Sequence, residues 1–233
     1  MGTLRYAAVR DGHCTICSPI YAAIHSILNH NNIVKFVGAG FTNQGNRFLV
    51  LERLTGGTLS QMLRYKSRMR NIKVGRLFKK QKKQMPPFDV LKCARSLAVA
   101  LEYMHKKAVP SCMLLHRDLK PDNICFELDG TVKLLDFGLV RIVQNANSKS
   151  EEAYDLSGET GSLRYMAPEV AKGHPYNHKV DVYSFGIILW EMKAGKRPFG
   201  ALRGKEDFFK FVVQRGDRPP LDHRNWMIRR ILT

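Results

Sequence analysis

Apolar residues near the start of the chain recur at helical spacing. The run SPIYAAIHSILN has Ser18 as a candidate N-cap and Pro19 at the first helical position. Its apolar residues fall on one helix face: Ile20, Ile24, Ile27 and Leu28. The pattern predicts a short amphipathic helix.

Two β-rich runs follow this helix. IVKFVG at 33–38 and RFLVLE at 47–52 are separated by FTNQGN, which supplies Asn and Gly for a turn. We therefore expect a β-hairpin. After a glycine pair, TGGTLSQML predicts the start of another helix.

The longest helical pattern begins at Phe88, in DVLKCARSLAVALEYMH. The expected core face consists of Val90, Leu91, Ala94, Leu97, Ala98 and Leu101. Short strands are predicted around MLLH, NICF and TVKLLDF, and a polar stretch at 144–159 has no periodicity. Helices are expected in DVYSFGIILWEM, EDFFKFVVQ and WMIRRIL. The predicted class is α+β, with a small sheet remnant followed by a mainly helical body.

Composition restricts the class of protein. A chain of 233 residues with 44% hydrophobic residues can form one large domain or two small lobes. No apolar run reaches the roughly 18 residues of a membrane span, and the start lacks the apolar core of a signal peptide. Without a secretion signal, the five cysteines favour reduced thiols and a cytoplasmic location. Cys14 and Cys17 form a lone CxxC, a weak candidate for a zinc site.

The net charge of +18 is concentrated in one segment. From Arg64 to Lys83, ten of twenty residues are Lys or Arg and none is acidic. This basic insertion (64–83) can be a solvated surface segment, or it can dock to an acidic protein, phosphoinositides or RNA. Because it lacks interleaved aromatic residues, nucleic acid is an unlikely partner.

Three motifs carry chemistry: HRDLKPDN at 116–123, DFG at 136–138 and APE at 167–169, with DVYSFG at 181–186 behind them. Together they resemble the protein kinase family, from about Asn29 to the end of the chain. The resemblance implies a bilobal kinase-like fold with a reduced N-terminal lobe. Residues 1–54 would form the partial small lobe with the hinge, and residues 55–233 the helical large lobe.

The resemblance also implies roles for the loop residues. Asp118 would accept or orient the proton of the substrate hydroxyl, and Lys120 would steady the γ-phosphate of ATP. Asn123 and Asp136 would be ligands of Mg²⁺, a hard cation that prefers oxygen donors. A metal phosphate and a catalytic carboxylate would share one site, which explains why acidic and basic side chains lie close together in this loop.

Four further residues match the adenine site of the family. Leu51 would lie at its back, the main chain of Glu52 and Leu54 would form the hinge, and Cys125 would lie at its floor. The cofactors implied are therefore ATP and Mg²⁺.

The same resemblance points to the substrate class. Lys120 in the loop and GETGSLRYMAPEV with Thr160 resemble serine/threonine kinases, so a protein Ser or Thr is the expected acceptor. The motifs HNNIV, GGTL and RYMAPEV most resemble those of the tyrosine kinase-like group. Arg117 suggests regulation by phosphate on the activation segment, with Ser157 and Thr160 as the expected sites.

The sequence departs from the family in its small lobe. It has no GxGxxG loop, no matching strand lysine and no helix glutamate, since Tyr21 stands at the glutamate position and Lys35 follows HNNIV. The arginine that normally pairs with Glu169 is also missing, because Arg224, Arg229 and Arg230 precede its position. The chain is expected to be truncated at both ends and to transfer phosphate slowly if at all.

Three hypotheses therefore stay open. The first is a protein serine/threonine kinase, which the complete catalytic set in the large lobe favours. The second is a pseudokinase or scaffold that binds partners without phosphate transfer. An RNA-binding protein, the third, rests only on charge.

Overall fold

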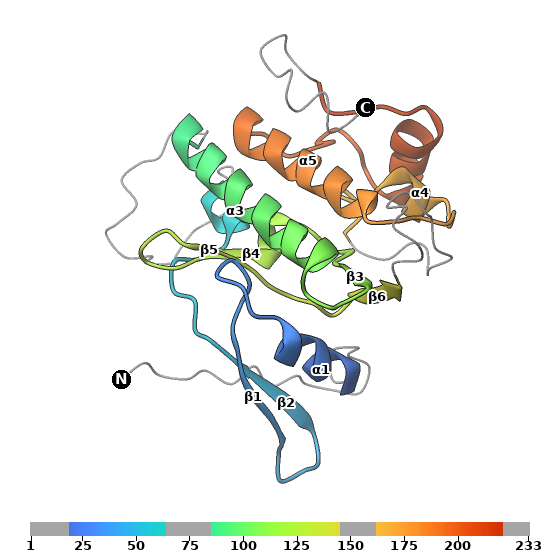
Figure 1. Cartoon of the computed structure of the whole chain (residues 1–233). Helices are drawn as coiled ribbons and strands as arrows, with labels where there is room; N and C mark the ends of the chain where they lie inside the picture. The colour runs from blue at the N-terminus through green and yellow to red at the C-terminus, as the bar shows by residue number, and fades with distance from the viewer. Residues whose placement is uncertain (1–18, 64–84, 145–161, 221–233) are drawn as a thin grey trace.

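The computed structural model describes residues 19–63, 85–144 and 162–220 (Figure 1). Its first elements are α1 (Pro19–Ile27), β1 (Phe36–Phe41), β2 (Arg47–Leu51), α2 (Leu59–Leu63) and α3 (Pro87–Lys106). They are followed by β3 (Cys112–Leu115), the 3-10 turn η2 (Pro121–Asn123), β4 (Ile124–Phe126), β5 (Val132–Leu134) and β6 (Arg141–Gln144). The last are α4 (Pro168–Ala171), α5 (Lys179–Ala194), α6 (Lys205–Asp207) and the π-helix η4 (Phe208–Gln214). The mixture confirms the α+β class.

The predicted helix and hairpin near the start are confirmed. Ile24 of α1 and Leu28, directly after the helix, are buried, whereas Ile27 is 43% exposed, so the buried face is narrower than expected. Strands β1 and β2 pair antiparallel, and the turn between them is closed by a hydrogen bond from Thr42 N to Asn46 O of 2.8 Å. Gly45 has a φ of +78°, which glycine adopts without steric cost.

The buried face of α3 differs in part from the expected one. Leu91 is 58% exposed and Ala98 is also exposed, so the prediction was wrong at both positions. The buried stripe instead consists of Val90, Cys93, Leu97, Ala100, Leu101, Met104 and His105. Leu91 directly follows the buried Val90, and Ala98 directly follows the buried Leu97. Because successive side chains of an α-helix point about 100° apart, both face away from the core.

Helix α5 is the centre of the large helical body. It is apolar on most of its surface, and Ile187, Ile188 and Met192 are completely buried. Gly195, with a φ of +59°, caps its end and donates its N–H to Glu191 O. Helices α3 and α5 pack against each other above β3 and β4 (Figure 1).

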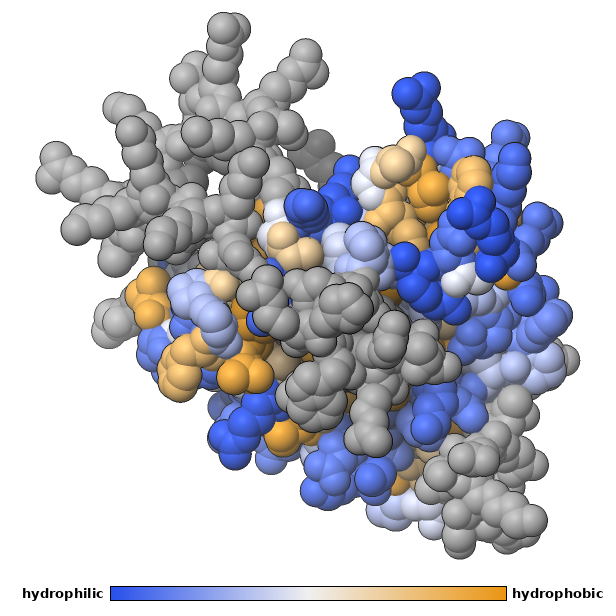
Figure 2. Space-filling model, turned by 90° about the horizontal axis from the view of Figure 1, so that it is seen from above, coloured by the Kyte–Doolittle hydropathy of each residue, from blue (hydrophilic) through white to orange (hydrophobic). Residues whose placement is uncertain are grey.

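Each of the three sheets in the described ranges has two strands: β1 with β2, β3 with β6, and β4 with β5. Strand β6 was not predicted. Seen from above, hydrophilic side chains cover most of the described surface, and hydrophobic ones form small separate patches (Figure 2). None of the helices in the described ranges is both long and apolar enough to cross a membrane.

The segment after β2 is fastened to β4. Gly56 N donates to Phe126 O at 2.8 Å, and Phe126 N donates to Gly57 O at 2.9 Å. A Cβ atom on Gly56 would lie 2.5 Å from Phe126 O and 2.7 Å from Glu127 O. Only glycine permits this approach of the two main chains.

We expect Gly56→Ala to lower the free energy of unfolding by about 1–3 kcal/mol, because the added methyl group must displace β4. Chemical denaturation measures the difference. Gly38→Ala is the matched control, since a Cβ atom there meets nothing within 4 Å. Equal stability of the two variants would contradict the requirement for glycine at position 56.

Candidate active site

The carboxylate of Asp118 is held from three sides. Lys120 Nζ lies 2.5 Å and Asn123 Nδ2 3.2 Å from Asp118 Oδ2, and Ser162 N donates to Asp118 Oδ1 at 2.9 Å. Asn123 Nδ2 also donates to the main-chain oxygen of Asp118 at 2.9 Å. The structure thus brings together Asp118, Lys120 and Asn123 as predicted, and adds Ser162, which the sequence did not indicate.

The turn before Asp118 is fixed by a buried aspartate. Arg117 has a φ of +70°, which is unfavourable for a residue other than glycine. Asp181, on α5, is fully buried and accepts bonds from Arg117 N at 2.8 Å, His116 N at 2.9 Å and His105 Nε2 at 2.8 Å. Asp181 therefore holds the strained backbone that presents Asp118.

Hydrogen bonding lowers the pKa of Asp181. Burial is the largest influence and raises the pKa, but the hydrogen bond from His105 and the other interactions outweigh it. The carboxylate is therefore ionised in the folded protein, and three donors depend on it.

The second expected metal ligand lies after β5. Leu135 N donates to Asn123 O at 2.9 Å, which joins the loop of Asn123 to the residue before Asp136. Asp136 has a φ of +60°, and its Oδ1 accepts a bond from Gly138 N at 3.3 Å, so among the described residues Oδ2 keeps room for a ligand. Asn123 uses its amide nitrogen on Asp118, and no described residue donates to its amide oxygen. Two oxygen donors suit Mg²⁺.

A series of aromatic rings runs beside these ligands. His25 of α1 lies between Phe36 and Phe137, with ring centroids 6.3 Å and 5.0 Å away. Phe137 in turn contacts His116, at 5.3 Å. Burial lowers the pKa of His25 to about 4, although the charge of Asp136 opposes the shift. His25 is therefore a neutral packing residue at neutral pH.

The expected adenine residues lie on β2, the segment after it and β4. Leu51 ends β2, and both Leu51 and Leu54 pack against the core. Cys125 lies in β4 and forms an antiparallel bridge with Thr58, which brings it to the end of the hinge segment. Burial raises the pKa of the Cys125 thiol. The positions agree with an adenine site, and the assignment stays a prediction.

Glu52 takes part in an ion cluster that the sequence did not indicate. Its Oε1 accepts a bond from Lys35 N at 2.8 Å and lies 2.8 Å from Nζ of Lys133, on β5. Glu127 Oε1 lies 3.2 Å from the same ammonium group. Burial, the largest influence, lowers the pKa of Lys133, but the bonds and charges of the two glutamates raise it overall. The ammonium group ties the hinge to the strand that precedes Asp136.

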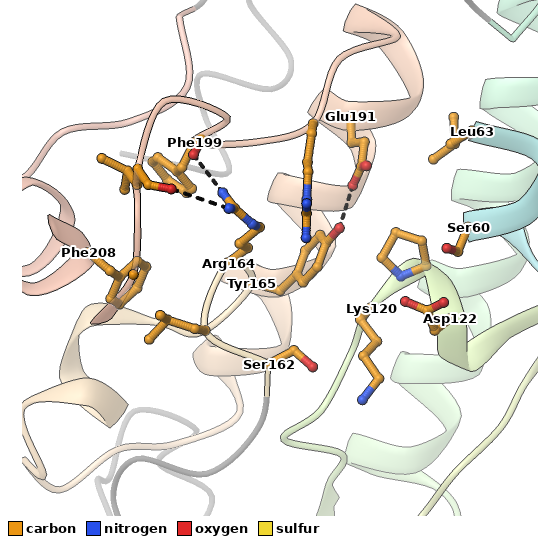
Figure 3. Close-up of a pocket in the computed structure, with 15 residues that line it drawn as sticks. Ser60, Leu63, Lys120, Asp122, Ser162, Arg164, Tyr165, Glu191, Phe199 and Phe208 are labelled. Carbon is orange, nitrogen blue, oxygen red and sulfur yellow. Dashed lines mark hydrogen bonds between the residues drawn. The ribbon is translucent and has the colours of Figure 1, made fainter. Parts of the chain in front are cut away.

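A cavity of about 690 Å³ opens beside Lys120 (Figure 3). Its lining comes from α2, η2, the segment 162–165, α5 and the loop after α5. Tyr165 Oη donates to Glu191 Oε2 at 2.7 Å, and burial raises the pKa of Glu191 to about 7. Lys120 and Ser162, two of the residues that hold the Asp118 carboxylate, both line this cavity.

Several expectations fall outside the described residues. They include the cysteine pair at 14 and 17, Ser18, the basic insertion 64–83, the activation-segment sites Ser157 and Thr160, the three arginines 224, 229 and 230, and the helix in WMIRRIL. Tyr21, which was expected at the position of the family's glutamate, lies in α1. Within the described ranges, no group of three or more His, Cys, Asp or Glu side chains could hold a metal ion, so the Mg²⁺ prediction depends on the Asn–Asp pair.

Comparison with known proteins identifies the family. Residues 21–223 match the description "Protein kinase domain". The chain is 38% identical to the serine/threonine-protein kinase VIK of Arabidopsis thaliana over 74% of this chain and 35% of the relative. It is 33% identical to the dual specificity protein kinase shkC of Dictyostelium discoideum, over 84% and 34%, and 37% identical to the serine/threonine-protein kinase CTR1 of Arabidopsis thaliana, over 77% and 19%.

The chain thus spans about a third or less of the length of these relatives. Their similarity agrees with the expected tyrosine kinase-like group. From the match over most of its length, together with the loop geometry around Asp118, we conclude that this chain belongs to the protein kinase family.

Proposed function

We propose that this chain is the catalytic part of a protein serine/threonine kinase, which transfers the γ-phosphate of ATP to Ser or Thr hydroxyl groups. The observation that carries the proposal is the Asp118 carboxylate, fixed by Lys120 and by Ser162 N at the edge of the cavity. Such a carboxylate would accept a hydroxyl proton, and the ammonium group beside it would contact the γ-phosphate.

The remaining site residues follow from this assignment. The main chain of Glu52 and Leu54 would bind adenine, between Leu51 and Cys125. Asn123 and Asp136 would hold Mg²⁺ through oxygen atoms that the hydrogen bonds described above leave available. When bound, the metal neutralises charge that develops on the phosphate oxygens. In the resting site, Lys120 offsets the charge of Asp118 through its contact with Oδ2.

The division into lobes is part of the proposal. Residues 1–54 would belong to the small lobe and residues 55–233 to the large lobe, with the basic insertion 64–83 as a docking segment for an acidic partner. The substrate would be a protein that enters the cavity beside Lys120. Within the described ranges, the fastening of Gly56 and Gly57 to Phe126 supports a boundary at this point.

The decisive experiment is the transfer of labelled phosphate from ATP to dephosphorylated casein by the purified chain. We expect slow but measurable transfer, and Asp118→Asn should reduce it by at least about a hundredfold, because the proton acceptor is lost. Asp129→Asn is the control, since Asp129 is an exposed carboxylate in the turn between β4 and β5. Transfer that is unchanged in Asp118→Asn would contradict the proposal.

The alternative is a pseudokinase. The sequence position of Tyr21, where a glutamate would hold the strand lysine, favours it. Binding of ATP, seen as a rise in melting temperature, without transfer that depends on Asp118 would support this alternative. Restoring a small lobe with a Gly-rich loop, strand lysine and helix glutamate should raise the activity of a kinase and leave a pseudokinase inactive.

A further inference from the structure

Arg164 spans one side of the cavity beside Lys120. Its Nη1 donates to Phe199 O at 2.6 Å and to Pro198 O at 3.0 Å, and its Nη2 lies 3.5 Å from Leu202 O (Figure 3). We call residues 198–202 the wall loop, because Phe199 and Leu202 line the cavity. One planar guanidinium group thus binds several carbonyl groups of this loop at once.

The wall loop has a strained conformation where Arg164 binds it. Phe199 has a φ of +50°, a left-handed conformation that a bulky residue rarely adopts. Its carbonyl oxygen accepts both the short bond from Arg164 and a bond from Leu202 N at 3.1 Å. Its ring contacts Phe208 edge to face, with centroids 6.3 Å apart. The strained loop is therefore held from both its main chain and its side chain.

The segment that contains Arg164 is also bound to the catalytic residues. Two residues earlier, Ser162 N donates to Asp118; one residue later, Tyr165 donates to Glu191 on α5. The segment 162–165 thus has one anchor on the catalytic carboxylate, one on α5 and one on the wall loop. Ser162, which binds Asp118, is therefore only two residues away from the side chain that binds the wall loop.

Arg164 is suited to this contact by its geometry rather than by its charge. Within the described residues, its hydrogen-bond partners are main-chain carbonyl groups and not carboxylates. Burial lowers its pKa, and the nearby charge of Arg197 adds to this effect. Lysine carries the same charge but lacks the planar fork, so it cannot reproduce the contact fully.

We propose that Arg164 is a positioning residue that holds the wall loop in place for protein substrate. That the ligand is a protein substrate rests on the function proposed above. That Arg164 holds the wall loop in place does not depend on that function.

The first test measures amide hydrogen exchange of residues 199–204 in the full chain, with Arg164→Met and Arg164→Lys. Arg164→Met should accelerate exchange about tenfold, since the loop loses the donors that hold it, and Arg164→Lys should have an intermediate effect. Arg197→Met is the matched control for exchange: it removes a positive charge from the same cavity, but Arg197 donates no hydrogen bond within the described residues. Unchanged exchange in Arg164→Met, or equal acceleration in Arg197→Met, would overturn the proposal.

The second test measures transfer of labelled phosphate to dephosphorylated casein. In Arg164→Met, KM for casein should rise several-fold, KM for ATP should stay constant, and Arg164→Lys should recover part of the loss. An unchanged KM for casein in an active protein would also overturn the proposal. If the unaltered chain transfers no phosphate, the kinase function fails while the exchange experiment still decides the role of Arg164.

Discussion

Asp181→Ala should lower the free energy of unfolding by about 3–5 kcal/mol, the largest effect expected of a single substitution on stability in this chain. Removing the fully buried carboxylate leaves the main-chain N–H groups of His116 and Arg117 and the ring of His105 without their acceptor. It also releases the left-handed turn at Arg117, so the position of Asp118 should change together with stability.

Urea denaturation at neutral pH measures this loss. Asp181→Asn keeps the shape of the side chain but replaces one acceptor oxygen by an NH₂ group, which must face a donor. Its loss of unfolding free energy should therefore be large, but smaller than that of Asp181→Ala. The control is Asp89→Ala, which removes an exposed carboxylate from the first turn of α3 and should cost only a few tenths of a kcal/mol. A loss in Asp181→Ala no larger than in the control would contradict the anchoring role.

His25→Leu should remove a large part of the loss of stability on acidification. In the folded state, the pKa of His25 is lowered from 6.5 to about 4, so the folded protein binds this proton less readily than the unfolded chain does. The stabilisation by neutral His25 is therefore complete above about pH 6.5 and is lost as the pH falls toward 4, by roughly 3 kcal/mol. Leucine fills a similar space between Phe36 and Phe137 and takes up no proton.

The measurement compares unfolding free energies of the two proteins at pH 7.5, 6 and 5. The difference between them should change with pH in favour of His25→Leu, because only the unaltered chain takes up this proton on unfolding. Asp136 faces the same ring, and its charge should moderate the change. Parallel pH curves for the two proteins would show that His25 does not titrate in this range.

Local patterns were sufficient for the elements near the N-terminus. The hairpin was predictable because its signal, two β-rich runs around an Asn and Gly turn, lies within twenty residues. The existence of α3 was predictable for the same reason. Its buried face was not, because Leu91 and Ala98 fit a helical period as well as Cys93 and Ala100 do. Only the neighbours that pack against the helix distinguish the two stripes.

In the candidate site, too, only the residues that lie close together in the sequence could be predicted. Asp118, Lys120 and Asn123 lie within one short loop, so a motif could place them together. Ser162 and Asp181 reach this loop from 44 and 64 or more residues away. The Asp in DVYSFG could have been suspected as a buried anchor, since a carboxylate in an apolar helix needs hydrogen-bond donors. No comparable signal marked Ser162, because it binds Asp118 through its main chain.

The cluster of Lys133 with Glu52 and Glu127 has a consequence for motion. The ion pair joins the hinge segment to β5, and β5 leads directly into Asp136. Rotation of the β1–β2 hairpin about residues 52–57 must therefore either break the contact between Lys133 and Glu52 or carry β5 with it. The Lys133 side chain is 10% exposed and the Glu52 side chain 24% exposed, so breaking the contact requires both charged groups to be solvated separately. Rotation of the β1–β2 hairpin and displacement of Asp136 are thus expected to occur as one coupled movement.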